Sequence, residues 1–232
     1  KAQFVRAGVF KDVDAVLFVH VGSDLGTGWG EGGGSGMVSV EYSFKGSSSH
    51  AAAAPWLGKS ALDAVELMEI AWNFKREHLR PQQRSHYVIT NGGAQPNVVP
   101  PDATVWYYFR ETDYNRIKAL WDLGDTMAKA ASEMTGTTWS SRVLGSAWPQ
   151  HGNRPMAEAM QANIQTVGLP EWSEADQQFG KALQRAMGAE ERGLATQVRP
   201  LRGRECIPEE EQTGGAADDI GDVRRACPAI TM

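Results

Sequence analysis

Two loops of the sequence carry polar side chains in settings that would let them reach a ligand. His50 lies in SSSHAAAA, where small neighbours allow a ligand to approach the backbone and the imidazole to extend outward. Asn97 lies in QPNVVP, and its amide can donate to a carboxylate or carbonyl oxygen. The alternatives are a solvated loop histidine and a turn-forming asparagine beside proline. Because the two loops belong to neighbouring predicted elements, we expect them to converge on one place.

Two further candidates stand at the ends of predicted strands. His20 ends the apolar run DAVLFVH, and a neutral imidazole at the carboxyl end of a strand is a good metal ligand. The alternative is a histidine that only makes a hydrogen bond there. Arg110 ends the aromatic run TVWYYFR, and its planar fork suits bidentate carboxylate binding. Its alternative is a surface ion pair with Glu111 or Asp113.

Aromatic and acidic clusters supply the remaining candidates. Trp106, Tyr107 and Tyr108 are predicted to pack within the sheet rather than to stack on a substrate. A second cluster consists of carboxylates, which can bind a metal or support its ligands, and which can equally cap a helix: Asp218, Asp219 and Asp222.

The segments around His20 and the carboxylates predict an α/β arrangement. Residues 14–21 form a continuous apolar run, which is typical of a strand buried on both faces of a parallel sheet. Eight glycines between positions 22 and 36 indicate a loop between two domains or beside a ligand. Further elements are predicted near both ends of the sequence: a helix ending at Gly8, helices over 155–167 and from Ser173, and a strand beginning in CPAITM.

Residues 37–148 show a different pattern. Ser60 and Asp113 are predicted to cap two helices, and Gly136 to end the second. Alternating or aromatic runs predict four strands: 37–44, 86–90, 104–111 and 137–144. The order strand, helix, strand, strand, helix, strand predicts a ferredoxin-like antiparallel sheet with both helices on one face. The predicted fold class is α/β, with this unit inserted between 1–36 and 149–232, the two parts of an α/β domain.

Four segments, taken in order, resemble the M20 metallopeptidase and amidohydrolase family, and within it the group formed by the B subunits of p-aminobenzoyl-glutamate hydrolase. They are VRAGVFKDVDAVLFVH (5–20), FKGSSSHAAAAPWLGKSALDAVELM (44–68), TNGGAQPNVVPPDATVWYYFRE (90–111) and GGAADDIGDV (214–223). The resemblance implies a zinc-peptidase-like catalytic α/β domain that holds two divalent metal ions, zinc or manganese. It also implies that the ferredoxin-like unit is an inserted lid that forms a homo- or heterodimer.

The resemblance also assigns roles to the candidate residues. His20 would bind one metal ion. His50 would stabilise the oxyanion of a tetrahedral intermediate, often in the active site of the other protomer of the dimer. Asn97 and Arg110 would hold the substrate carboxylate, and Asp219 would lie on a pocket loop, although Ala216 and Ala217 depart from the small hydroxyl residues usual there.

The implied reaction is attack of a metal-bound water, activated by a glutamate, on the amide of an N-acyl or aryl amino acid such as p-aminobenzoyl-glutamate. The family's HxD, GHD and EEGG motifs and its downstream histidine do not occur in these 232 residues. We therefore expect the sequence to be part of a longer one. Another hypothesis is a non-catalytic dimerisation or ligand-binding module, and a weaker one is a small-ligand regulatory domain.

Composition narrows the possible partners and location. There are 23 basic and 28 acidic residues, a net charge of −5, without a long basic stripe, so nucleic acid is not expected to bind. The longest apolar runs fall short of the roughly 18 residues of a membrane span, and the start lacks a signal-peptide core. Cys206 and Cys227 have no metal-type spacing. These observations favour a reduced, cytoplasmic protein without membrane contact.

Overall fold

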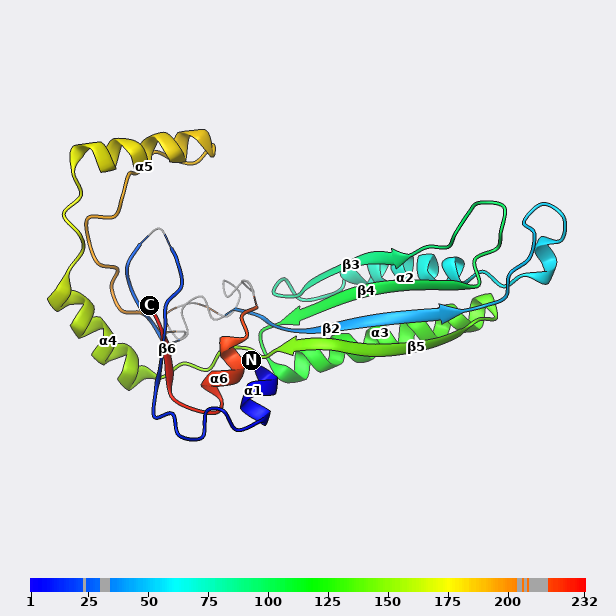
Figure 1. Ribbon diagram of the computed structural model, residues 1–232, viewed down its shortest axis with the longest axis horizontal. Coiled ribbons are helices and arrows are strands. Elements are labelled where there is room, and N and C mark those ends of the chain that lie inside the picture. Colours follow the sequence, from blue (N-terminus) through cyan, green and yellow to red (C-terminus); the bar gives the residue numbers. More distant parts are fainter. Residues whose placement is uncertain (23, 30–33, 204–205, 207, 209–216) are drawn as a thin grey trace.

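The structure is a computed structural model that describes residues 1–22, 24–29, 34–203, 206, 208 and 217–232. It is elongated, with a sheet and two long helices at one end and short strands and further helices at the other (Figure 1). The glycines at 214 and 215 and the alanine at 216, which belong to the segment 214–223, lie outside the described residues. No helix of the described ranges is long and apolar enough to cross a membrane.

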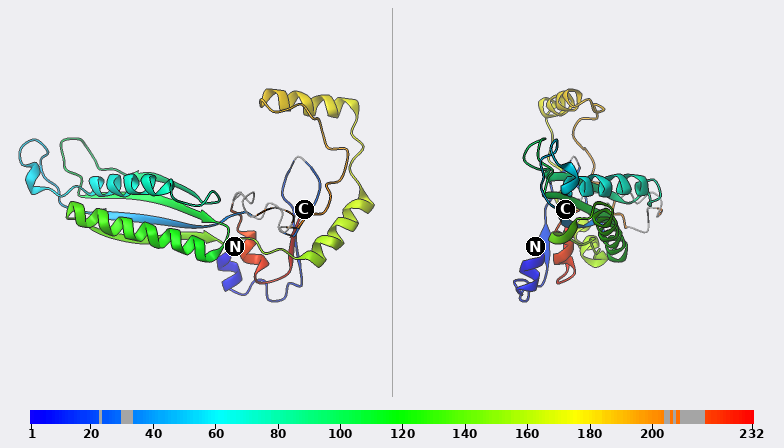
Figure 2. Two further views of the ribbon diagram at one scale, coloured as in Figure 1. Left: turned by 180° about the vertical axis from the view of Figure 1, so that it is seen from behind. Right: turned by 90° about the vertical axis from the view of Figure 1, so that its right-hand side faces the viewer.

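The large end is the four-stranded antiparallel sheet that the sequence predicts. Its strands lie in the order β3-β4-β2-β5. The elements follow one another as β2 (Gly36–Lys45), α2 (Ala61–Arg76), β3 (Arg84–Asn91), β4 (Asp102–Glu111), α3 (Tyr114–Thr135) and β5 (Thr138–Ala147). This strand order and the two helices on one face are those of a ferredoxin-like unit (Figure 2). Its role as a lid stays a prediction.

Local signals begin and end the two long helices where the sequence indicates. The Ser60 side chain accepts a hydrogen bond from the Asp63 N–H at 3.1 Å, and Asp113 accepts one from the Arg116 N–H at 2.9 Å. Gly136 ends α3 in the left-handed region, with φ of 66°, which a residue without Cβ adopts most easily. Between these caps, one face of each helix packs on the sheet.

The core lies between that sheet face and the helices. Alternate side chains of β2 and β4 are buried, and Trp72 of α2 packs among them with its indole N–H donating to Ser85 Oγ at 2.7 Å. Gly124 brings α3 close to the sheet, because a Cβ there would lie 2.6 Å from the Tyr42 hydroxyl and 2.7 Å from the Phe109 ring. The helix can therefore approach the aromatic layer only without a side chain at this position.

The small end joins segments from the two ends of the sequence. β1 (Val16–Phe18) pairs in parallel with β6 (Ala229–Thr231). The helices here are α1 (Ala2–Arg6), α4 (Arg154–Val167), α5 (Glu174–Ala186) and α6 (Ile220–Arg224), and a 3-10 turn at Pro55–Leu57 lies at the far end of the sheet. The structure thus combines a parallel and an antiparallel sheet, as the α/β class requires. The exact domain division, 1–36, 37–148 and 149–232, stays a prediction.

The predicted buried strand over 14–21 is wrong in length and in burial. Only Val16–Phe18 is a strand, and Leu17 and Val19 are 67% and 66% exposed. Val16 and Phe18 pack against the apolar side of α6. The exposed Leu17 and Val19 lie on the face opposite Val16 and Phe18, so within the described residues no layer covers that face of β1.

Gly124→Ala is expected to destabilise the protein by about 1–3 kcal/mol, because the added methyl group overpacks the contact with Tyr42 and Phe109. The sign of this change distinguishes close packing from helix propensity, because Gly→Ala at an uncrowded helix position stabilises a protein by roughly 1 kcal/mol. Urea unfolding would measure the change. Gly145→Ala is the matched control, because nothing lies within 4 Å of a Cβ there. Equal effects of the two substitutions would contradict the close-packing account.

Candidate functional site

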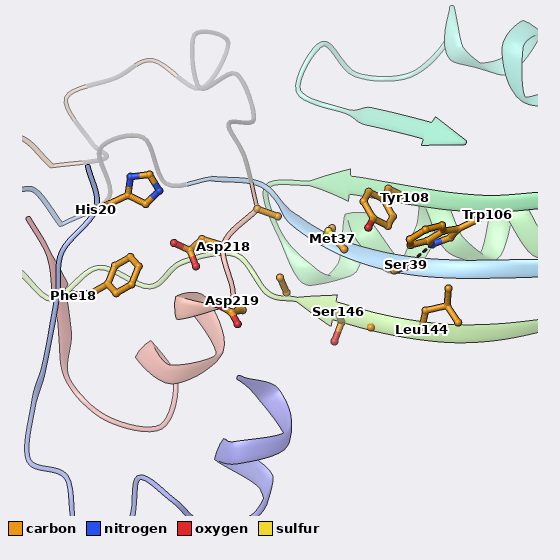
Figure 3. Close-up of a pocket in the computed structure, with 13 residues that line it drawn as sticks. Phe18, His20, Met37, Ser39, Trp106, Tyr108, Leu144, Ser146, Asp218 and Asp219 are labelled. Carbon is orange, nitrogen blue, oxygen red and sulfur yellow. Dashed lines mark hydrogen bonds between the residues drawn. The ribbon is translucent and has the colours of Figure 1, made fainter. Parts of the chain in front are cut away.

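A cleft of about 670 Å³ lies between the end of β1 and the helix-free face of the sheet (Figure 3). Its walls come from β1, β2, β4, β5 and the residues before α6. It collects one predicted site residue, two carboxylates and an aromatic wall: His20, Asp218, Asp219, Trp106 and Tyr108. The cleft therefore lies between the small end of the molecule and the sheet, and both contribute residues to its lining.

His20 stands at the carboxyl end of β1, where the sequence places it. Its backbone N–H donates to the Met232 carbonyl at 3.0 Å, which continues the pairing of β1 with β6. Its Nδ1 lies 2.9 Å from the Val21 carbonyl. Because a carbonyl oxygen only accepts, Nδ1 carries the proton and the lone pair of the neutral ring is on Nε2. The exposed Nε2 is thus the atom able to bind a metal.

The described residues do not complete a metal site around His20. Among them no group of three or more histidine, cysteine, aspartate or glutamate side chains is arranged to hold an ion. A protein zinc site requires three or four such ligands. His20 can supply one ligand at most, so no chemical step is assigned to a metal on the residues described.

The three carboxylates of the predicted cluster do not lie together: the two before α6 line the cleft, and the one within α6 does not. Asp218 lines the cleft and accepts a hydrogen bond from the N–H of Ile220, the first residue of α6, at 3.0 Å; the N-cap position itself is Asp219, whose side chain makes no capping bond. Asp219 also lines the cleft and bonds to the Lys1 side chain. Burial acts to raise the pKa of Asp219, but its hydrogen bonds to Lys1 outweigh this and the pKa is lowered. Asp222 is 5% exposed, does not line the cleft, and burial raises its pKa.

Strand alternation separates the three consecutive aromatic residues of β4. Tyr107 faces the helices and is fully buried, as predicted. Trp106 and Tyr108 face the opposite side and line the cleft, so for these two residues packing within the sheet rather than stacking on a substrate stays a prediction. Their rings meet edge to face, with centroids 5.3 Å apart, and the Trp106 N–H donates to Ser39 Oγ at 2.7 Å. The two-residue period of a strand was the signal for this division.

Arg110 lies beside this aromatic wall. Its guanidinium carbon is 5.2 Å from the centre of the Tyr108 ring, and its register partners are Met37 on β2 and Arg84 on β3. No ion pair with Glu111 or Asp113 is present within the described ranges. Two arginines opposite each other repel, so an anion between them would be favourable. Arg110 does not itself line the cleft, but it lies against Tyr108, which does, and this placement suits a carboxylate bound beside that ring.

The loops of His50 and Asn97 converge as predicted. The Ala51 N–H donates to the Asn97 carbonyl at 2.9 Å, and His50 bridges to Val98. Both side chains are exposed. The Nδ1 of His50 accepts from the N–H groups of Ala52 and Ala53, each at 3.2 Å. Nε2 therefore carries the proton of the neutral ring and is a free donor at the tip of the molecule.

These loops lie at the opposite end of the sheet from Arg110. They join the sheet beside Asp102, where the Gly46 N–H donates to the Pro101 carbonyl at 2.7 Å. Along β4, the distance from Asp102 to Arg110 is roughly 27 Å at about 3.4 Å per residue. One copy of the chain therefore does not bring Asn97 and Arg110 to a single carboxylate, contrary to the simplest interpretation of their predicted roles.

Solved structures share this fold. A putative aminohydrolase from methicillin-resistant Staphylococcus aureus superposes with a TM-score of 0.66 at 14% identity, over 99% of this chain and 52% of that one. An aminobenzoyl-glutamate utilization protein from Klebsiella pneumoniae gives 0.57 at 18% identity, over 96% and 56%. At such identities the likeness establishes the fold.

One family model and several curated relatives match the sequence. Residues 33–135 match the M20 peptidase dimerisation domain. The B subunit of p-aminobenzoyl-glutamate hydrolase from Escherichia coli is 34% identical over 98% of this chain and 51% of its own length. The Xaa-Arg dipeptidase of Mus musculus is 33% identical over 60% and 31%. Residues 33–135 therefore belong to the M20 peptidase dimerisation domain family, and the chain spans about half or less of the length of these two relatives.

Asp222→Asn is expected to raise the free energy of unfolding at pH 7 and to have little effect near pH 3. Burial raises the folded pKa of Asp222 above its unfolded value, so ionisation costs stability as the pH rises through that range. The asparagine cannot ionise but can still accept a hydrogen bond. Urea unfolding of both proteins at the two pH values tests this; an equal difference at both would contradict it.

Proposed function

We propose that this chain is part of a hydrolase that cleaves the amide bond of an N-acyl or N-aroyl amino acid with a free carboxylate. The supporting observation is the cleft itself, whose lining combines His20 with Trp106 and Tyr108, together with Arg110, which lies against the Tyr108 ring. The E. coli relative is named for p-aminobenzoyl-glutamate, a substrate with an aromatic acyl group and carboxylates. An aromatic wall beside a guanidinium matches those two groups.

Metal dependence belongs to the proposal for the whole protein, with two zinc or manganese ions as the family resemblance implies. Such ions would polarise the amide carbonyl and supply the attacking water. In the described part of the chain, His20 is the residue that would contribute a ligand. The remaining ligands and the general base would come from residues other than those described.

The residues of this chain would then act from two places. Arg110 would hold the substrate carboxylate by a bidentate contact, and Trp106 and Tyr108 would face the acyl group. His50 would donate its Nε2–H to the carbonyl oxygen as negative charge develops there. Asn97, next to His50, would donate its amide to the same substrate.

We propose that these two sets meet in a dimer, with the tip of one copy completing the cleft of another. The separation of roughly 27 Å along β4 supports this, because it keeps the sets apart in one copy. The family description as a dimerisation domain agrees. A heterodimer is also consistent, since the E. coli relatives are named as two different subunits of one hydrolase.

Mixing two inactive variants of the full-length protein tests the shared site. His50→Ala and Arg110→Gln are each expected to lower kcat/KM strongly as homodimers. After the protomers exchange, a mixed dimer has one site with both groups intact, so the mixture should recover roughly a quarter of wild-type activity. Hydrolysis of p-aminobenzoyl-glutamate with Mn²⁺ or Zn²⁺ is the measurement.

The matched control is a mixture of His50→Ala with Asn97→Ala. Both residues lie on the same tip, so neither site of a mixed dimer would be intact and activity should not return. Recovery in both mixtures would contradict the division between two copies. A protein that dimerises without hydrolysing any such amide would instead favour the alternative function, a non-catalytic dimerisation module.

Trp106→Leu is expected to lower kcat/KM for a benzoyl or p-aminobenzoyl amide by about tenfold, because the leucine loses the aromatic contact. The acetyl amide of the same amino acid should change much less. The ratio of the two kcat/KM values is the readout. Val143→Leu, an exposed substitution on β5 away from the cleft, is the control. An equal loss for both substrates would show that Trp106 only supports the sheet.

A further inference from the structure

A second, more polar pocket of about 310 Å³ lies on the other side of His20. It is formed by the glycine-rich segment after β1, by β6 and by Arg224 at the end of α6. His20 and Asp218 line both this pocket and the cleft. A group bound in the pocket would therefore lie next to the candidate reaction centre.

Arg224 is unusual because it is buried and has no anionic partner among the described residues. The residue is only 7% exposed, yet no carboxylate of the described residues forms an ion pair with it. Its Nη2 donates to the Thr231 hydroxyl, and its Nε has no hydrogen-bond partner. Asp218 is the acidic neighbour, but its carboxylate is engaged at the start of α6.

The surroundings hold the guanidinium in place. Thr231, which accepts from Arg224, is itself fixed because the Thr27 hydroxyl donates to its carbonyl at 2.7 Å. Arg199 lines the same pocket and pairs with Asp24 at 3.6 Å, so its charge is already offset. Within the part of the chain that the structure describes, Arg224 is therefore the charge in this pocket that lacks a counterion.

An unpaired buried guanidinium is costly, at several kcal/mol, unless an anion joins it. We propose that this pocket is an anion-binding subsite in which Arg224 holds an oxyanion, a carboxylate or a phosphate. The anion has two possible sources. It is either an acidic side chain on the amino acid of the substrate, which rests on the proposed function, or a free inorganic anion.

The binding test is independent of catalysis. Thermal unfolding is followed with sodium phosphate or glutarate against sodium chloride at equal ionic strength. At concentrations about ten times Kd, the anions should raise the Tm of the wild type by about 3 °C or more. Arg224→Met should abolish this shift. Arg225→Gln should keep it, because Arg225 is exposed, does not line the pocket and donates to the Pro149 carbonyl at 3.4 Å.

A separate measurement checks that the Arg224→Met variant is folded. Without anions, Arg224→Met should be at least as stable as the wild type, because it removes an unpaired buried charge. Arg224→Lys keeps the charge but not the planar fork, and should bind the anions more weakly than the wild type. An anion shift that persists in Arg224→Met, or no shift in the wild type, overturns the subsite.

A kinetic comparison identifies the source of the anion. N-benzoyl-glutamate and N-benzoyl-glutamine differ only in the charge of the side chain. If that side chain occupies the subsite, Arg224→Met should lower the glutamate to glutamine ratio of kcat/KM by roughly tenfold or more. An unchanged ratio with retained phosphate binding assigns the subsite to a free anion. If no amide is hydrolysed, the proposed function fails while the binding test still decides the subsite.

Discussion

Side chains of consecutive strand residues point to opposite faces of a sheet. In β2 and β4 this alternation determines which side chains form the core and which line the cleft. The inward set packs against α2 and α3 and is almost completely buried, as at Val40 and Tyr107. The outward set, which includes Ser39 and Trp106, forms a wall of the cleft. Stability and recognition are thus built from alternate residues of the same strands. A one-residue slip in register would exchange the two sets and remove both.

Strand length imposes the second constraint. β2 and β4 pair over their whole length, from Gly36 opposite Glu111 to Lys45 opposite Asp102, so the two ends of the sheet are held apart rigidly. The His50 loop is attached at one end and the cleft lies at the other. No side chain spans such a distance, so contacts between these places require a second molecule. A dimer would use this rigidity to place the donor at a fixed depth.

Local features of this fold could be predicted from the sequence, whereas burial that depends on distant neighbours could not. Ser60, Asp113 and Gly136 act through bonds or torsions within a few residues, so their roles follow from the sequence alone. The convergence of the His50 and Asn97 loops follows from strand order. The apolar run around Leu17 has the composition of a buried strand, but burial requires a layer on each face.

For the candidate site, the sequence indicates the individual residues but not how they are grouped in space. Residue types and the family resemblance indicate His20, His50, Asn97 and Arg110, but only the register of β4 shows that they form two groups. The alternation of β4 assigns Trp106 to the cleft face once each aromatic residue is considered separately.

The junction between the two ends of the molecule carries buried charge that its own contacts do not neutralise. Asp222 and Arg224 are two positions apart on α6 and are both less than 10% exposed, yet they do not pair. Residues two apart on a helix point about 200° apart, so one faces the sheet junction and the other the polar pocket. Apolar residues at positions 222 and 224 would give a more stable protein, because no buried charge would have to be desolvated. Charge retained at such a cost, beside His20, is the arrangement expected where a protein must bind a charged ligand rather than only fold.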